Sequence, residues 1–87
     1  MKLLVIEDDR EASAYIVKGL GESGYTVDHA AEGRDGLFMA SSGAYDAIIV
    51  DRMLPGMDGL AIIAALRAAD IRTPVLILSA LGAVDDR

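Results

Sequence analysis

Acidic side chains follow two apolar segments of this chain, and they are the residues best suited to chemistry. The run Glu7-Asp8-Asp9 comes directly after one apolar segment, Asp51 comes directly after another, and a hydroxyl residue, Ser79, follows a third. Carboxylates are the ligands that hard divalent cations such as Mg2+ prefer, and a carboxylate can also accept a phosphoryl group. These residue types therefore predict a site for a cation, a phosphoryl group or both.

The acids are expected to lie close together because each apolar segment before them is predicted to be a strand of one parallel sheet. Functional groups collect at the carboxyl ends of such strands, and if the first and third strands are adjacent, Asp8 and Asp51 lie within a few ångströms of each other. Two carboxylates about 5 Å apart repel by roughly 3 kcal/mol at an effective dielectric constant of about 20. They need a raised pKa or a bound cation, and Mg2+ meets that need.

Short apolar segments alternate with longer amphipathic ones, which predicts successive strand-helix units around a parallel sheet, an α/β fold. The predicted strands are residues 2–6, 25–30, 47–50 and 75–78. The predicted helices begin near Asp9 or Arg10 and end at Gly24, run over 34–42, and begin near Asp58 and end before Asp70. Residues 79–82 are predicted to be a loop, and 83–87 the first turn of a further helix.

The helices are predicted to cover the sheet with apolar stripes. The stripe residues are Ala12, Ile16 and Leu20 in the first helix, and Leu60, Ile63 and Leu66 in the third. The first, third and fourth strands are nearly continuous aliphatic runs, typical of strands that are covered on both faces and flanked by other strands. As the last strand, residues 75–78 would leave a hydrophobic edge exposed, so we expect the chain to be part of a longer polypeptide.

Composition limits the classes of function. The net charge of -6 argues against direct binding to a nucleic-acid backbone, which is neutralised by Lys and Arg. The chain has no cysteine, which excludes disulfides and thiolate metal sites. No segment approaches the roughly 20 apolar residues that span a bilayer, and Met1–Ile6 runs into acids rather than a cleavage site. We expect one domain without a membrane segment, located in the cytoplasm.

Each candidate residue also has a simpler structural interpretation. Asp9 and Asp58 are good helix N-caps, and Asp51 could be a residue that starts a turn. Ser79 could be a loop hydroxyl, and His29 is interpreted as a surface residue of an edge strand rather than as a ligand or base. These interpretations fail mainly in combination, because three independent strand ends all carry suitable oxygen groups.

Three motifs of the chain together resemble a known family. They are Val5-Ile6-Glu7-Asp8-Asp9, the segment 48–59 with its Asp51-Arg52-Met53-Leu54-Pro55-Gly56 core, and the segment 73–80 that ends in Ser79-Ala80. The chain resembles the receiver domains of bacterial two-component response regulators, in particular the subgroup whose receiver precedes a winged-helix DNA-binding domain. The resemblance implies a flavodoxin-like, doubly wound parallel sheet with strand order 2-1-3-4-5, here truncated after strand four.

The resemblance also implies roles for individual residues. Asp51 would accept the phosphoryl group from the phosphohistidine of a sensor histidine kinase. Glu7 and Asp8 would hold Mg2+, with Asp51 and the backbone carbonyl of Met53 as further ligands. Ser79 would hydrogen-bond the phosphoryl group and act as the switch hydroxyl. The domain would not be an enzyme in its own right, although it would take part in its own phosphorylation and dephosphorylation.

The family pattern continues with a Lys-Pro pair and a switch aromatic on a fifth strand, positions that lie beyond Arg87. Residues 1–87 are therefore expected to be a receiver domain incomplete at its C-terminus. The resemblance implies a homodimer on activation of the full-length protein, and DNA contact only through an output domain that this sequence lacks. The alternatives are a receiver-like interaction module that is never phosphorylated, and an aspartyl-phosphate phosphatase. The second would resemble enzymes with an acid where this chain has Met53.

Overall fold

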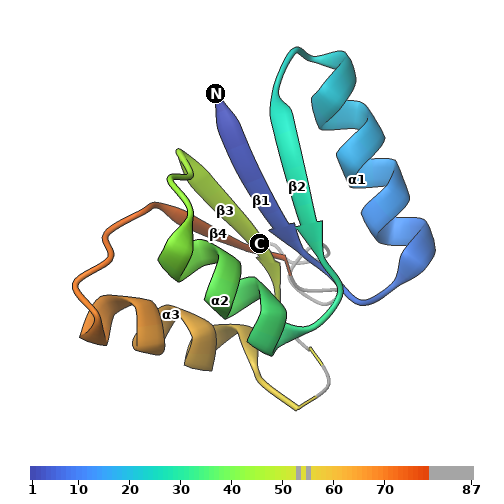
Figure 1. The fold of residues 1–87 in the computed structure, drawn as a ribbon. Coiled ribbons are helices and arrows are strands. Elements are labelled where there is room, and N and C mark those ends of the chain that lie inside the picture. Colours follow the sequence, from blue (N-terminus) through green and yellow to red (C-terminus); the bar gives the residue numbers. More distant parts are fainter. Residues whose placement is uncertain (53, 55, 79–87) are drawn as a thin grey trace, which may run out of the picture.

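The computed structural model describes residues 1–52, 54 and 56–78, in which strands and helices alternate along the chain (Figure 1). The strands are β1 (Lys2–Ile6), β2 (Thr26–Ala30), β3 (Ala47–Asp51) and β4 (Val75–Leu78). The helices are α1 (Arg10–Glu22), α2 (Gly33–Ser42) and α3 (Gly59–Ala68). The predicted order of elements is confirmed over this part of the chain. The predicted loop 79–82 and helical turn 83–87 lie outside the described residues.

The strands form one parallel sheet in the order β2-β1-β3-β4 (Figure 1). Leu4 pairs with Asp28 of β2 on one side and with Ile48 of β3 on the other. The predicted adjacency of the first and third strands is therefore confirmed. Because parallel strands end at the same edge of a sheet, the acids after β1 and the Asp51 at the end of β3 are brought to one place.

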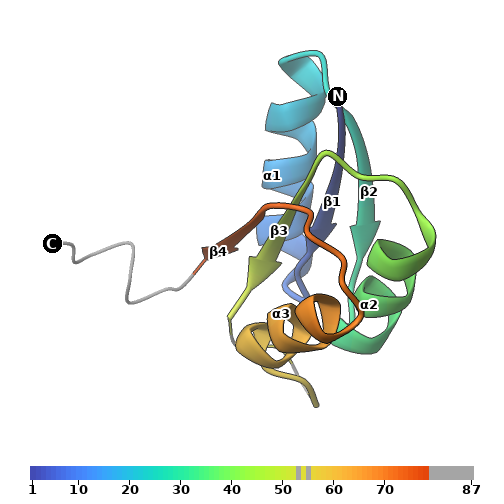
Figure 2. The ribbon, with the colours of Figure 1, turned by 90° about the vertical axis from the view of Figure 1, so that its left-hand side faces the viewer.

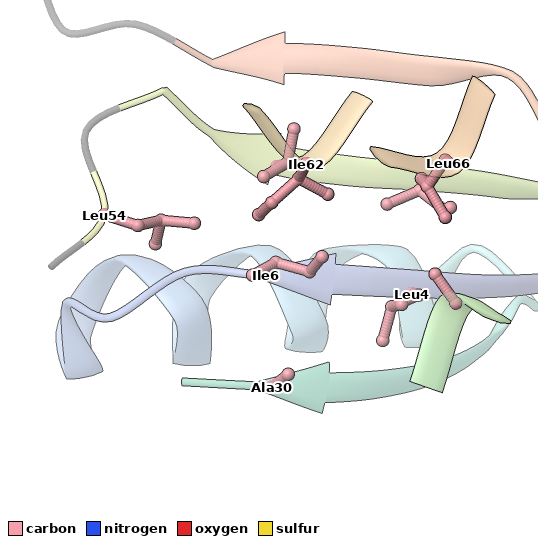
Figure 3. Close-up of a cluster of buried hydrophobic side chains, with 9 residues drawn as sticks. Leu4, Ile6, Ala30, Leu54, Ile62 and Leu66 are labelled. Atoms are coloured by element: carbon pink, nitrogen blue, oxygen red, sulfur yellow. The ribbon is translucent and has the colours of Figure 1, made fainter. Parts of the chain in front are cut away.

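Helices cover both faces of the sheet, with α1 on one side and α2 and α3 on the other (Figure 2). The core lies on the α2 and α3 side, where Ile62 and Leu66 of α3 point into the same cluster as Leu4 and Ile6 of β1 (Figure 3). The buried members of this cluster are Leu4, Ile6, Ala30, Ala40, Ile48, Val50, Leu54, Ile62 and Leu66. Full burial of one such aliphatic side chain contributes about 1.5–3 kcal/mol.

Local signals explain where the helices begin and end. The Asp9 carboxylate accepts a hydrogen bond from the Glu11 N–H at 3.2 Å, and the Asp58 carboxylate accepts one from the Leu60 N–H at 3.0 Å. Both are N-caps, which stabilise a helix by about 1 kcal/mol each. Gly24 has a φ of +96° just after α1, a left-handed conformation that favours glycine. The predicted caps and the predicted helix stop are confirmed.

The predicted buried stripe of α3 is wrong at Leu60. Ile62 and Leu66 are fully buried, whereas the Leu60 side chain is 45% exposed. Capping by Asp58 makes Gly59 the first helical residue, and Gly59 is buried against the backbone that follows β3. The helix face that meets the sheet therefore passes through residues 59, 62 and 66, and Leu60 lies outside it.

The face of the sheet on the α1 side is less covered than predicted. The predicted α1 stripe of Ala12, Ile16 and Leu20 is half-buried, and Ser13 is the buried residue of that helix. Leu76 of β4 is 59% exposed, so the prediction that this strand is covered on both faces is wrong for the part of the chain that is described. The reason is the position of α1, which contacts β1 and β2. None of the helices described is long and apolar enough to cross a membrane.

Candidate acidic site

Three carboxylates meet at the carboxyl edge of the sheet. Oxygen atoms of Glu7, Asp8 and Asp51 all lie within 4.8 Å of one another. Glu7 is buried, Asp51 is half-buried and Asp8 is exposed, so the cluster extends from the core to solvent. This arrangement offers hard oxygen ligands on one accessible side, which is the donor set that fits Mg2+.

Glu7 is held by hydrogen bonds at its backbone and at its side chain. Its N–H donates to the Ala30 carbonyl at 3.0 Å, which extends the pairing of β1 with β2 by one residue. Its Oε2 accepts from the Asp9 N–H at 3.1 Å. Its carbonyl oxygen lies 2.9 Å from Nε2 of His29 on β2. The Glu7 carboxylate is therefore presented in a defined place rather than on a free loop.

The cluster carries an electrostatic cost. Burial raises the pKa of Glu7 above its ordinary value, while the hydrogen bond from the Asp9 N–H lowers it. The negative charges of Asp51 and Asp8 and a side-chain hydrogen bond to Asp51 raise the pKa further. The net effect is a raised pKa, because burial and neighbouring negative charge both disfavour the carboxylate form. A cation among these oxygens would remove this cost.

The first residue of α3 lies against the backbone of Asp51. The Gly59 N–H donates to the Arg52 carbonyl at 2.9 Å. A Cβ atom at position 59 would lie 2.8 Å from the Asp51 carbonyl oxygen, closer than side chains approach backbone. Glycine at this position therefore lets α3 begin directly behind the strand end that carries Asp51.

A cavity of about 460 Å3 opens beside the carboxylates. Its lining residues are Asp8, Ala31, Glu32, Gly33, Arg34 and Gly56. Asp8 belongs to both the cavity and the carboxylate cluster, so small solutes can approach the cluster from this side.

The structure brings together the predicted acids Glu7, Asp8 and Asp51. The carboxylates of Asp9 and Asp58 instead cap α1 and α3. Ser79 and Met53, also predicted to belong to the site, lie outside the described residues. Sequence reasoning missed the contacts of His29 with Glu7 and of Gly59 with Asp51. The first contact depends on the strand register, which places His29 opposite Val5 and is known only from the structure.

Comparison with known proteins identifies the family. Residues 3–87 match the family model described as the response regulator receiver domain. The transcriptional regulatory protein HprR of Escherichia coli is 48% identical over 87 residues, which make up 100% of this chain and 39% of HprR. The chain thus spans well under half the length of this relative.

Solved structures agree in fold. The receiver domain of the Francisella response regulator 1452 is 39% identical, with a TM-score of 0.88 over 92% of this chain and 66% of that one. The response regulator TrrA of Thermotoga maritima, solved in complex with Mg2+-BeF, is 30% identical, with a TM-score of 0.86 over 91% of this chain and 69% of TrrA. A complex of TrrA with the histidine kinase ThkA also matches, at 28% identity and a TM-score of 0.86 over 99% of this chain and 74% of the matched chain.

The four-stranded sheet, its strand order and the family match over residues 3–87 agree with one another. They lead to one conclusion: this chain belongs to the response regulator receiver domain family, whose members are signalling domains.

Proposed function

We propose that this chain is the phosphoacceptor part of a two-component response regulator, with Asp51 as the residue that receives the phosphoryl group in a Mg2+-dependent reaction. The observation that carries the proposal is the meeting of Glu7, Asp8 and Asp51 within 4.8 Å at the carboxyl edge of the sheet. In the receiver family an acidic cluster at this edge suits a phosphoryl-accepting site, because functional groups of such sheets gather there.

The proposed step is a simple displacement. A carboxylate oxygen of Asp51 attacks the phosphorus of a phosphohistidine, the new P–O bond forms, and the P–N bond breaks with its electron pair returning to the imidazole. Mg2+ would neutralise charge on the incoming phosphoryl group. Glu7 and Asp8 would hold the ion, while Asp51 would contribute one oxygen to it and use the other as the nucleophile.

Two further roles rest on the motifs rather than on the described part of the fold. The backbone carbonyl of Met53 would be the remaining protein ligand of Mg2+. Ser79, which follows β4 in the sequence, would donate a hydrogen bond to the phosphoryl oxygens and act as the switch hydroxyl. Both positions match the family pattern in this sequence.

The partners follow from the relatives. The match to TrrA, which has been solved with the histidine kinase ThkA, supports a sensor histidine kinase as the phosphodonor. HprR is a transcriptional regulatory protein of which this chain spans 39%, which supports a longer protein with a DNA-binding output domain. Residues 1–87 would then be the N-terminal receiver portion, and phosphorylation would favour a homodimer of the full-length protein.

The test is phosphorylation of the full-length protein with acetyl phosphate, with and without Mg2+. We expect a base-labile adduct of one phosphoryl group on Asp51 that requires Mg2+ and disappears in Asp51→Asn. Asp9→Asn is the matched control, because Asp9 is a neighbouring acid that caps α1 and lies outside the carboxylate cluster. This control variant should be phosphorylated like the wild type.

The outcomes separate the proposal from its alternatives. The same adduct in the wild type and in Asp51→Asn would contradict Asp51 as the acceptor. No adduct in the wild type, together with unchanged binding to partners, would favour an interaction module that is never phosphorylated. Continuous release of phosphate from many substrates would favour a phosphatase.

A further inference from the structure

The segment that carries Glu7 and Asp8 leaves the sheet at the end of β1. At this point one side chain of β2 is hydrogen-bonded to the backbone of the segment. The Glu7 N–H continues the pairing of the two strands by donating to Ala30. The next acceptor, the Glu7 carbonyl oxygen, lies 2.9 Å from Nε2 of His29. A carbonyl oxygen can only accept, so Nε2 of His29 carries the hydrogen and donates it.

The position of His29 follows from the strand register. His29 pairs with Val5, so its side chain starts two residues before Glu7 along the sheet and reaches forward to the Glu7 backbone. The chain then leaves β2 after Ala30 and begins α2 at Gly33. The imidazole therefore supplies a donor to Glu7 at the point where the backbone of β2 turns away from β1.

The carboxylate of Glu7 depends on this backbone. Glu7 is buried, with 7% of its surface exposed, and its Oε2 is fixed by the Asp9 N–H only two residues further on. A displacement of the Glu7 carbonyl would move the short segment 7–9 as a unit, together with the oxygens that lie within 4.8 Å of Asp51. The distances among the three carboxylates are thus linked to the bond from His29.

We propose that His29 is a positioning residue of the acidic site, which acts by holding the Glu7 backbone and not by binding the metal or the phosphoryl group. The proposal rests on the function proposed above for Glu7, Asp8 and Asp51. Partners that orient the groups binding a metal commonly affect metal affinity without contacting the ion. Because Nε2 of His29 is hydrogen-bonded to the Glu7 carbonyl oxygen, this nitrogen holds the Glu7 backbone.

Three substitutions in the full-length protein distinguish the effect of the hydrogen bond from the effect of the side chain as a whole. His29→Gln places an amide N–H about where Nε2 lies, His29→Asn has an amide too short to reach Glu7, and His29→Ala removes the donor altogether. Two quantities are measured for each: the Mg2+ dissociation constant by titration calorimetry, and the acetyl phosphate reaction rate as a function of Mg2+ concentration. Thermal unfolding without Mg2+ records stability separately.

We expect His29→Ala and His29→Asn to raise the Mg2+ dissociation constant by about three- to tenfold, the effect of one ordinary hydrogen bond. The rate at saturating Mg2+ should stay close to that of the wild type, because Asp51 itself is unchanged. His29→Gln should restore Mg2+ affinity to within about twofold of the wild type, because it keeps a donor. Thr26→Ala, an exposed position on the same strand, is the control and should leave Mg2+ affinity unchanged.

Unchanged Mg2+ affinity in His29→Ala, or an equal loss in the Gln and Asn variants, would overturn the positioning role. A lower melting temperature with an unchanged Mg2+ dissociation constant would also overturn it, since the bond would then be only structural. If the Ala variant fails to fold, the comparison of Gln with Asn decides alone. If the wild type binds no Mg2+, the proposed function itself fails, and the role of His29 fails with it.

Discussion

At the residue scale, the fold disfavours the charged form of the Glu7 carboxylate, whereas the proposed function requires this form to bind Mg2+. Its carboxylate is buried and lies near two other carboxylates, and burial followed by these charges raises its pKa. The folded state therefore binds the Glu7 proton more tightly than the unfolded chain does. The contribution of Glu7 to stability is present below its ordinary pKa and is lost as the pH rises through the raised value.

Replacement of Glu7 by glutamine should have opposite effects on stability and on metal binding. Without Mg2+ at neutral pH, Glu7→Gln should raise the melting temperature, because a neutral amide replaces a buried charge among like charges. Mg2+ affinity should fall by at least about tenfold, because glutamine lacks the negative charge and one of the two oxygens with which Glu7 would hold the ion. Thermal unfolding between pH 4 and 8 and titration calorimetry measure the two effects.

The stabilisation should shrink as the pH falls, because Glu7 of the wild type is then protonated as well. A variant that is less stable than the wild type at neutral pH without Mg2+ would contradict the electrostatic cost assigned to Glu7. Asp9→Gln is a suitable control, because Asp9 is an exposed helix cap and its loss should lower stability at neutral pH.

Residue types alone predicted the acids of the site, but they did not predict what holds these acids in place. Glu7, Asp8 and Asp51 could be selected because each follows an apolar segment. The sequence indicates a surface residue at position 29, and His29 is exposed, yet its imidazole is hydrogen-bonded to the Glu7 carbonyl oxygen. That contact joins residues 22 positions apart, so no local spacing reveals it.

At the element scale, α3 and β3 are joined by a contact that only glycine permits. The Gly59 N–H is bonded to the Arg52 carbonyl, and a side chain at position 59 would meet the backbone of Asp51. Backbone atoms cannot turn aside as the end of a flexible side chain can. A larger residue would therefore have to displace the start of α3 or the end of β3.

Replacement of Gly59 by alanine should lower the free energy of unfolding by about 1–3 kcal/mol, the usual cost of overpacking. Because the strain falls on Asp51, the rate of its phosphorylation should fall as well. Gly19→Ala is the matched control, since a Cβ on this helical glycine of α1 meets nothing within 4 Å. That variant should gain about 0.5–1 kcal/mol through helix propensity.

Urea unfolding and acetyl phosphate labelling of the two glycine variants measure stability and reactivity. An alanine at position 59 that behaves like the alanine at position 19 would show that α3 can shift without cost.

The identity of the elements was predictable from periodicity and caps. The face of α3 was not, because burial of Gly59 against the strand end, rather than the apolar pattern, sets the rotation of the helix.

At the scale of the whole molecule, the two faces of the sheet differ. The α2 and α3 side holds the continuous core, whereas α1 contacts β1 and β2 on the other side. Val75 and Ile77 of β4 pack against the core, so Leu76 points to the α1 side, where it is 59% exposed. An exposed leucine on a strand at the end of a sheet favours association.

We expect the 87-residue chain by itself to self-associate through this part of the sheet. Leu76→Lys should weaken the association at least about tenfold, because burial of one leucine contributes about 1.5–3 kcal/mol. Leu60→Lys is the control, because Leu60 is also an exposed leucine but lies on α3. Sedimentation velocity over a range of concentrations measures both. A monomeric wild type, or equal effects of the two lysines, would contradict this expectation.

The sequence by itself determined the class of fold, the order of its elements, the helix caps and the acids that could form a site. These depend on local properties: hydrophobic periodicity, capping side chains and the residue that follows each strand. Tertiary structure alone decided the distance among the carboxylates, the raised pKa of Glu7, the bond from His29 and the contact at Gly59. These depend on strand register and helix rotation, which arise when distant segments pack together.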